Sequence, residues 1–331
     1  MNDRAARLHA LLSGFAGRRV LVVGDVMLDE YLIGAPSRVS REAPVLVLEQ
    51  QRRFVRPGGG ANPAVNLQSL GAMPRLIGVI GDDDVGAELG RALSALGMSD
   101  ADLVTDHGAE STRKTRILAE TASSNGQQLL RVDRLGRAPS PTAQLAIEAS
   151  IHALAEEVDA ILISDYKGGA ISPSTVDAAR RAARSHGKLL SVDSQGELDR
   201  FHGFDLVKCN RPDAEAFLGR ALESNSDYAD AGMSLARELD IGWLMITLGA
   251  DGIAVSSPAQ FEHVPATNRT EVFDVAGAGD TVVAVATLAL VCDGSGGDAA
   301  VLANLAAGQV VRKLGVATTT VPELRDLLAE L

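Results

Sequence analysis

The chain has 331 residues, of which 31 are Lys or Arg and 43 are Asp or Glu, so its formal net charge is −12. Hydrophobic residues make up 46% and charged residues 22%, which is typical of a globular protein with a sizeable core. An acidic chain without a block of basic residues repels phosphate backbones and anionic lipids, so we expect neither a nucleic acid nor a membrane as partner.

Apolar, β-branched runs alternate with segments of helical periodicity along most of the chain, which predicts a parallel α/β sheet. In chain order, we expect buried strands over residues 19–24, 75–80, 158–164, 188–192, 205–209 and 243–248. Helices are predicted over residues 61–71, 84–96, 141–156, 173–186, 226–239, 280–292 and 298–313. No long linker interrupts this pattern, so we treat residues 1–331 as a single domain, with ligands at the carboxyl ends of the strands.

Two segments, residues 30–56 and 112–133, depart from this alternation of strands and helices. They contain short alternating apolar and polar runs and no helical pattern. They predict a small antiparallel sheet inserted into the main domain. A lid over a cleft and a dimer contact are the two natural uses of such an insert, and both remain open.

Localisation signals are absent from the sequence. The longest apolar run, residues 281–292, is shorter than the roughly 20 residues that a membrane span needs. The first residues mix charges with apolar side chains and lack the apolar centre of a signal peptide. Cys209 and Cys292 have neither CxxC spacing nor histidine neighbours, which argues against disulfides and zinc. We therefore expect a cytoplasmic protein.

The segment from Asp274 to Asp280, DVAGAGD, directly precedes an apolar helix. Its small residues Gly277, Ala278 and Gly279 let backbone N–H groups converge at a helix N-terminus, where the macrodipole favours an anion. Asp280 could be an N-cap, or it could accept a proton from a hydroxyl while the N–H groups hold a transferring phosphoryl group. In the second case we expect the helix dipole to lower the pKa of Asp280.

A second glycine cluster, at residues 58–60, precedes Asn62. Without side chains, backbone can approach a polyhydroxy ligand closely, and Asn62 adds a donor and an acceptor. An ordinary strand-to-helix turn explains the cluster equally well. Asp25 and Asp29 follow the first strand, which fits either the binding of sugar hydroxyls or simple turn chemistry.

Two later strands also end in polar turns. The turn from Thr247 to Gly252 could lie against a nucleotide, or it could form a hairpin without a ligand. The segment from Asn210 to Glu215 carries oxygens that could position hydrated Mg²⁺ on phosphates or could cap a helix. The sequence has no GxxxxGK[ST], no GxGxxG after the first strand and no GxSxG, so a Walker loop is excluded and a nucleotide-dependent oxidoreductase is disfavoured.

Taken together, the segments GDVMLDEYLIG, RPGGGANPAVNLQSLGA and DVAGAGDT resemble the ribokinase/PfkB family of sugar kinases over about residues 18–322. SRVSREAPV, STRKTRIL, GQQLLRVD, SDYKGGA and VRKLG are similar to its heptose-7-phosphate kinase branch. The resemblance implies a ribokinase-like three-layer α/β/α fold with a mostly parallel central sheet and a small β-sheet lid, forming a homodimer through the lid. It also implies a kinase domain alone, without the nucleotidyltransferase domain to which some relatives are fused.

The activity implied by this resemblance is transfer of a phosphoryl group from ATP, with Mg²⁺ and a monovalent cation such as K⁺. The acceptor would be the anomeric hydroxyl of D-glycero-β-D-manno-heptose 7-phosphate, on the route to lipopolysaccharide. Asp280 would be the catalytic base, and Gly277, Ala278 and Gly279 would form the anion hole. The sugar would bind at Asp29, Gly58, Gly59 and Asn62. ATP would lie along Asn210, Thr247, Gly249, Gly252 and Asn304, with Asp213 near Mg²⁺ and Asp274 near the monovalent cation.

A phosphorylated sugar also requires cations in an otherwise acidic protein. The candidates are Arg38, Arg41, Lys114, Arg116, Arg131 and Lys167, each of which could instead be a solvated surface charge. The chain departs from the branch in several places: Arg41 replaces a proline, Gln195 a lysine and Asp213 a glutamate. These departures leave a kinase for fructose, ribose or fructose 6-phosphate as an alternative, and a non-catalytic ligand-binding protein as another.

Overall fold

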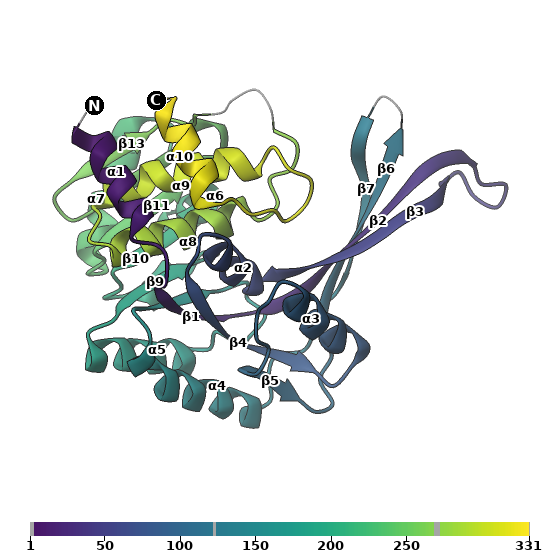
Figure 1. The fold of residues 1–331 in the computed structure, drawn as a ribbon, viewed down its shortest axis with the longest axis horizontal. Helices are drawn as coiled ribbons and strands as arrows, with labels where there is room; N and C mark the ends of the chain where they lie inside the picture. Colours follow the sequence, from purple (N-terminus) through teal and green to yellow (C-terminus); the bar gives the residue numbers. More distant parts are fainter. Residues whose placement is uncertain (1–2, 122–123, 268–271, 331) are drawn as a thin grey trace.

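The computed structural model of the chain describes residues 3–121, 124–267 and 272–330. Its centre is a nine-stranded sheet with the order β13-β12-β11-β10-β9-β8-β1-β4-β5 (Figure 1). All pairs from β5 to β11 are parallel, whereas β12 pairs antiparallel with β11 and β13 pairs antiparallel with β12. The strands are β1 (Arg19–Gly24), β4 (Met73–Gly81), β5 (Leu103–Asp106), β8 (Ala160–Ser164), β9 (Leu189–Asp193), β10 (Leu206–Asn210), β11 (Trp243–Thr247), β12 (Ile253–Ser256) and β13 (Phe261–Val264).

Two hydrophobic cores lie on the two faces of this sheet, because successive side chains of a strand point to opposite faces. In β1, Val20 and Val22 belong to one core, and Leu21 and Val23 belong to the other. The first core is covered by α1 (Asp3–Ser13), α2 (Ala61–Ser69), α3 (Asp84–Ala95), α8 (Ala278–Val291), α9 (Gly296–Val310) and α10 (Val321–Ala329). The second is covered by α4 (Pro141–Leu154), α5 (Pro173–His186), α6 (Arg211–Leu218) and α7 (Asn225–Glu238). Figure 1 shows α8 and α9 above the sheet and α4 and α5 below it, which confirms the three-layer α/β/α fold.

Local sequence signals set the ends of several helices. Ser140 and Ser172 each accept a hydrogen bond from an N–H group in the first turn of the following helix, and each precedes a proline. Both are therefore N-caps of the preferred type. The proline follows at the first helical position, where a backbone N–H would have no hydrogen-bond partner within the helix. Helix α5 ends at His186 and is capped by Gly187, whose φ of 59° lies in the left-handed region that favours glycine.

The strands and helices expected from the sequence are all present, with ends that agree to within a few residues. Helices α1 and α10 and the short strands β5, β12 and β13 were not predicted, and α6 was expected only as a helix that the segment from Asn210 could cap. The three missed strands have four residues each, too few to show a period. No helix within the described residues is long and apolar enough to cross a membrane.

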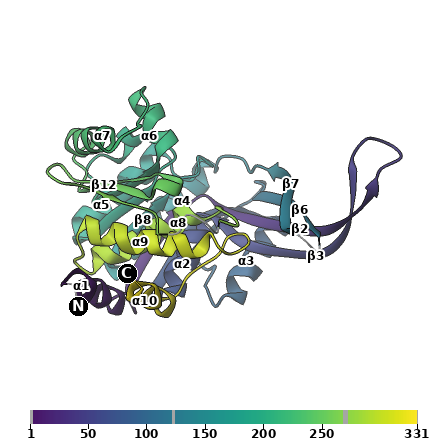
Figure 2. The ribbon, with the colours of Figure 1, turned by 90° about the horizontal axis from the view of Figure 1, so that it is seen from above.

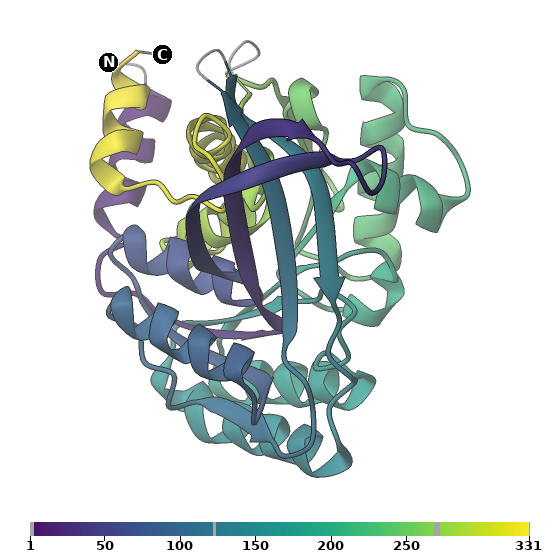
Figure 3. The same cartoon turned by 90° about the vertical axis from the view of Figure 1, so that its right-hand side faces the viewer.

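A second sheet, with the order β3-β2-β6-β7, projects from the body and corresponds to the expected lid (Figures 1 and 2). It consists of β2 (Val26–Val39), β3 (Leu46–Gly59), β6 (Thr112–Thr121) and β7 (Ser124–Arg134), and Figure 3 looks onto it. The β2–β3 and β6–β7 pairs are antiparallel as expected, whereas the central β2–β6 pair is parallel. The lid is thus two hairpins from separated segments, joined side by side.

Candidate active site

The carboxyl ends of the parallel strands gather polar residues at one edge of the sheet. Strand β1 lies between β8 and β4, so the order of the strands reverses there, and ligands of such sheets bind outside the carboxyl ends at this point. Asp193 ends β9, Asn210 ends β10 and Thr247 ends β11. Tyr166 follows β8 by two residues, and its hydroxyl contacts the first turn of α8. The candidate site is therefore built where β8–β11 meet the start of α8.

Asp280 lies in the first turn of α8 and is only 2% exposed. The helix begins at Ala278, and the N-cap position belongs to Gly277, so the interpretation of Asp280 as an N-cap is wrong. Gly277 has a φ of 79°, and a Cβ added there would lie 2.6 Å from Asn62 Nδ2. A residue without a side chain thus allows the backbone at the start of α8 to approach the start of α2.

Two donors hold the carboxylate of Asp280. Asn62 Nδ2 donates to Asp280 Oδ2 over 2.7 Å, and the Tyr166 hydroxyl lies 2.9 Å from Oδ1 and 3.0 Å from Oδ2. Asn62 Oδ1 accepts a hydrogen bond from Asn66, and Asn66 Oδ1 in turn accepts one from Thr281, next to Asp280. Two hydrogen bonds thus connect α2 to α8, one from Asn62 to Asp280 and one from Thr281 to Asn66, and a third joins Asn66 to Asn62.

The environment of Asp280 raises its pKa to about 7, so the expected lowering by the helix dipole is wrong. Burial is the main cause, because it disfavours the charged form, and the nearby carboxylate of Asp193 adds to it. The hydrogen bond from Asn62, the charge of Lys208 and the hydrogen bond from Tyr166 act in the opposite direction. The result is a carboxyl group that titrates near neutral pH, which is the range suited to a general base.

A buried ion pair lies beside this carboxylate. Lys208 Nζ donates to both oxygens of Asp193, over 2.8 and 3.0 Å, and both side chains are more than nine-tenths buried. Burial alone would lower the pKa of Lys208, but the charge and hydrogen bond of Asp193, together with the charge of Asp280, outweigh burial and raise the pKa. A Cβ added to Gly279 would lie 2.6 Å from Lys208 Nζ, so the absence of a side chain lets the ammonium group approach the start of α8.

The sequence analysis did not single out Lys208 or Tyr166 as parts of this site. Lys208 had one signal: it is a lysine within an otherwise apolar, buried strand, where charged residues are rare unless they are paired. Tyr166 lies in SDYKGGA, one of the segments that carry the family resemblance, but the residue type alone indicates no role, because a tyrosine after a strand is common in turns and cores alike. Its contact partner Asp280 is 114 residues away in the sequence.

The residues expected along the nucleotide surround one cavity of about 570 Å³, a size typical of small-molecule sites. Asn210, Thr247, Gly249, Gly252 and Asn304 all line it, together with Lys208, Ala278 and Gly279. Asn304 Nδ2 also donates to Pro265 O over 2.7 Å. Apolar walls come from Ile253, Val272, Val275, Val282 and Val311. The turn from Thr247 to Gly252 joins two antiparallel strands, so it is a hairpin turn and also part of the cavity wall.

The two candidate metal positions differ. Asn210 Oδ1 accepts a hydrogen bond from Asp213 N over 2.8 Å and thereby caps α6, while Asp213 Oδ2 is buried without a partner among the described residues. Burial raises the pKa of Asp213. Asp274 accepts hydrogen bonds from Ala276 N and Gly315 N, one on each carboxylate oxygen. Nowhere in the described part of the chain do three or more His, Cys, Asp or Glu side chains form a group that could hold a metal ion. The unpaired oxygen of Asp213 suits a magnesium ion that keeps most of its water.

On the lid, Asp29 and Arg116 form an ion pair, and both are largely buried. Gly58 packs against the Asp29 carboxylate so closely that a Cβ there would overlap it. Gly59 has a φ of 55°, and its neighbours likewise leave no room for a Cβ. These positions therefore shape the base of the lid, whatever ligand they contact.

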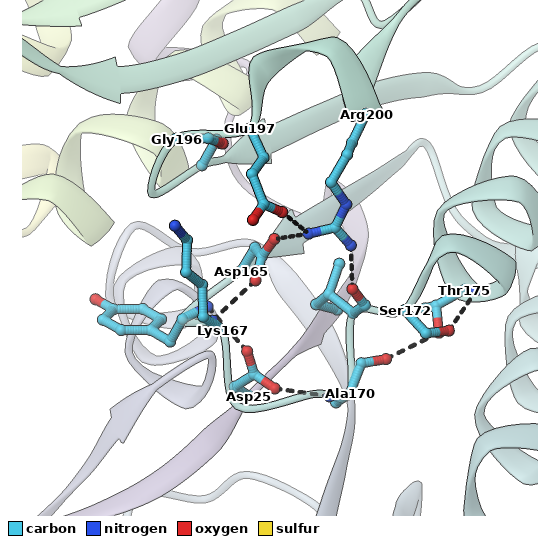
Figure 4. Close-up of polar contacts among 12 residues, drawn as sticks. Asp25, Asp165, Lys167, Ala170, Ser172, Thr175, Gly196, Glu197 and Arg200 are labelled. Carbon is cyan, nitrogen blue, oxygen red and sulfur yellow. Dashed lines mark hydrogen bonds and ion pairs between the residues drawn. The ribbon is translucent and has the colours of Figure 1, made fainter. Parts of the chain in front are cut away.

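The expected phosphate-binding cations occupy different environments. Arg131 lies directly opposite Arg116 in the β6–β7 register, but it forms an ion pair with Asp133 and is about half exposed. Lys114 Nζ lies 5.5 Å from the centre of the Tyr166 ring, so it is close to the group that contacts Asp280. Lys167 is exposed, with a φ of 58°, and Figure 4 shows its side chain on the loop that carries Asp165.

Comparison with known proteins gives this geometry a context. A sequence model described as pfkB family carbohydrate kinase matches residues 18–324. The "Bifunctional protein HldE" of Caulobacter vibrioides is 40% identical over 327 residues, which are 98% of this chain and 65% of that protein. The chain thus spans slightly less than two thirds of the length of this curated relative.

Two solved structures share the fold. Phosphofructokinase-2 from Escherichia coli in complex with potassium matches with a TM-score of 0.77 and 19% identity, covering 95% of this chain and 99% of that chain. Ribokinase from Thermotoga maritima matches with a TM-score of 0.70 and 19% identity, with the same coverage. At this identity the likeness concerns the fold, and it confirms the ribokinase-like architecture.

Proposed function

The chain belongs to the pfkB family of carbohydrate kinases, and from that premise we propose that it transfers the γ-phosphoryl group of ATP to a sugar hydroxyl, with Asp280 as the base. The observation that carries the proposal is the position of the Asp280 carboxyl group. It lies in the first turn of α8, next to Ala278 and Gly279, which line the cavity, and it contacts Asn62 of α2 and Tyr166. Phosphoryl transfer needs mainly positioning, charge neutralisation and one group that accepts the proton of the nucleophile.

Each part of the mechanism has a candidate residue. ATP would occupy the 570 Å³ cavity, with its phosphates toward Gly279 and the N-terminus of α8, where N–H groups and the macrodipole favour anions. Lys208, next to Gly279, would neutralise charge that develops on the transferring group. Asp280, with its pKa raised to about 7, would take the proton of the sugar hydroxyl.

Cation sites complete the proposal. Mg²⁺ supplies charge neutralisation on the phosphates of ATP. Asp213 and Asn210 would hold it, Asp213 through its unpaired oxygen and intervening water. K⁺ would lie near Asp274; a phosphofructokinase-2 that shares the fold was solved with potassium. We further propose that residues 1–331 act as one kinase unit and that the lid excludes water from the acceptor.

For the acceptor, we propose the anomeric hydroxyl of D-glycero-β-D-manno-heptose 7-phosphate, which would place the reaction in lipopolysaccharide synthesis. The support is the 40% identity to a curated HldE, together with the basic residues Lys114, Arg116 and Arg131 on the lid. Asp29 and Asn62 are the proposed contacts of the sugar hydroxyls. Fructose 6-phosphate is the second candidate, because phosphofructokinase-2 has the same fold.

The lid also has features of an oligomer contact. Its apolar side chains Leu130, Val132 and Val39 are more than half exposed, which is costly for a free surface. We propose that a second copy of the chain covers them, giving a homodimer through the lid. Sedimentation at micromolar concentration tests this, and a monomer would contradict it.

The test of the activity is the release of ADP from ATP and Mg²⁺ with a panel of acceptors: heptose 7-phosphate, fructose 6-phosphate, fructose, ribose and adenosine. Selective turnover of heptose 7-phosphate is the expected result, with Asp280→Asn reduced by at least about 10²-fold, since removal of a general base costs 10²–10⁴. Turnover of another sugar would overturn the acceptor and keep the kinase. Binding of ATP without any ADP release would favour a non-catalytic ligand-binding protein.

A further inference from the structure

The hydroxyl of Tyr166 contacts both carboxylate oxygens of Asp280, and nothing in the mechanism above uses this contact. We propose that Tyr166 is a positioning residue, which holds the carboxylate of Asp280 in the orientation that faces the acceptor hydroxyl. This inference rests on the proposed function, in which Asp280 is the base.

The loop that carries Tyr166 is fixed by a buried carboxylate. Asp25, at the end of β1, accepts hydrogen bonds from Tyr166 N and Gly168 N on one oxygen and from Ala170 N on the other, each over 2.9 Å. A Cβ added to Gly168 would lie 2.8 Å from this carboxyl group, so the loop wraps Asp25 closely (Figure 4). The backbone of Tyr166 is thus tied directly to the residue that follows β1.

A second buried carboxylate holds the same loop from the other side. Asp165 accepts a hydrogen bond from Lys167 N over 2.9 Å and pairs with Arg200 over 2.9 Å (Figure 4). Lys167 adopts a left-handed backbone conformation with a φ of 58°, which a lysine adopts only where surrounding contacts impose it. These contacts restrict the movement of the loop that carries Tyr166. A residue that positions a catalytic group must itself be held in place in this way.

The contact also leaves room for a substrate. An ionised carboxylate has about four acceptor positions, two on each oxygen. Asn62 and Tyr166 both reach Oδ2, whereas Tyr166 alone is the donor that reaches Oδ1 among the described residues. One acceptor position therefore stays open on Oδ1 for the hydroxyl of the sugar. Burial keeps the pKa of Tyr166 well above its ordinary value, so the hydroxyl remains a donor at neutral pH.

Tyr166 also connects the base to the lid. Lys114, on strand β6, lies with its ammonium group 5.5 Å from the centre of the ring, a distance at which a cation attracts an aromatic face. The ring therefore lies between a lid side chain and the carboxylate of Asp280.

The test compares Tyr166→Phe with Tyr228→Phe, a buried tyrosine on α7 that bonds to Arg211 and is outside the proposed site. Tyr166→Phe keeps the ring and its contact with Lys114, and it removes only the donor. We expect kcat to fall at least about 10-fold, as for the loss of a hydrogen bond to a charged group. The acidic limb of the kcat/KM profile should shift to higher pH, because the ionised form of Asp280 loses a donor. Tyr228→Phe should show neither change.

A loss of kcat without a shift of the limb would overturn the proposal, as would an unchanged enzyme. The proposal can also be tested without turnover, by the pH dependence of the free energy of unfolding, to which Asp280 contributes through the pKa of its folded state. Asp193 and Lys208, which also face Asp280, are the same in all three proteins. If no sugar in the panel is phosphorylated, the proposed function fails. A shift of this dependence in Tyr166→Phe would still support the contact between Tyr166 and Asp280, and no shift would overturn it.

Discussion

Asn62 Nδ2 lies 2.7 Å from Asp280 Oδ2, although the two residues are 218 positions apart in the sequence. The bond joins the first turn of α2 to the first turn of α8, and both side chains are almost completely buried. The amide that the glycine-rich segment suggested as a sugar ligand is thus also a support of the proposed base. These two roles lead to different experimental results.

For Asn62→Ala, we expect the acidic limb of the kcat/KM profile to shift to higher pH and kcat to fall, because the bond from Asn62 lowers the pKa of Asp280. A residue that binds only the sugar would instead raise KM and leave the limb in place. Steady-state kinetics between pH 5 and 9 distinguish the two results. Asn225→Ala, in the first turn of α7, is the control for an asparagine change outside the site.

Asp280 should also make the stability of the protein depend on pH. Its folded-state pKa of about 7 lies above the ordinary value of 3.8, so its contribution to stability is fully present at low pH and is lost as the pH rises through about 7. Asp280→Asn cannot lose a proton. We therefore expect its free energy of unfolding, relative to the wild type, to increase between pH 4 and 8, as measured by urea denaturation. A constant difference would mean that the carboxyl group is ionised throughout this range.

Lys208→Met should destabilise the protein strongly, because it leaves the buried carboxylate of Asp193 without its partner. Breaking such a pair costs about 3–5 kcal/mol. The double variant Lys208→Met/Asp193→Leu should recover much of that stability but no kinase activity, since the ammonium group next to Gly279 is still missing. Thermal unfolding and ADP release, each measured on the wild type, the single variant and the double variant, test the expected stability and the expected activity. Recovery of activity together with stability would exclude a role of Lys208 in phosphoryl transfer.

Two neighbouring cations on β6 provide a matched test of the phosphate site. Lys114 lies near Tyr166, whereas Arg113 lies 3.6 Å from Glu30 in the adjacent strand. Lys114→Met should raise KM for a sugar phosphate at least about 10-fold, and it should raise KM for the unphosphorylated sugar much less, because the loss of a charge-assisted contact affects only the charged ligand. Arg113→Met should affect both substrates equally. Equal effects of Lys114→Met on the two substrates would remove Lys114 from the phosphate site.

Much of the site could be predicted because its signals are local. Glycine at residues 58, 59, 249 and 252 and the polar residues that follow the strands are visible in short segments, and the carboxyl ends of parallel strands meet at one edge of the sheet. The residues that the family resemblance assigns to the nucleotide, Asn304 included, line one cavity in the structure. The partner of each charged side chain could not be predicted from short segments, because it comes from a distant part of the chain. Arg116, a candidate for binding the phosphate of the substrate, forms an ion pair with Asp29, which is 87 residues away.

The sequence by itself determined the α/β alternation, the two inserted segments of the lid and the acidic residue at the start of α8, because each depends on a period or on the conformational demands of residues close in the chain. Only the tertiary structure decided the parallel pairing of the two lid hairpins, the contacts of Asn62, Tyr166 and Asp193–Lys208 around Asp280, and the direction of its pKa shift. The helix start, which the sequence does reveal, predicts a lowered pKa, but burial and the carboxylate of Asp193 raise it. Burial is a property of the whole packed chain, so no local segment could show it.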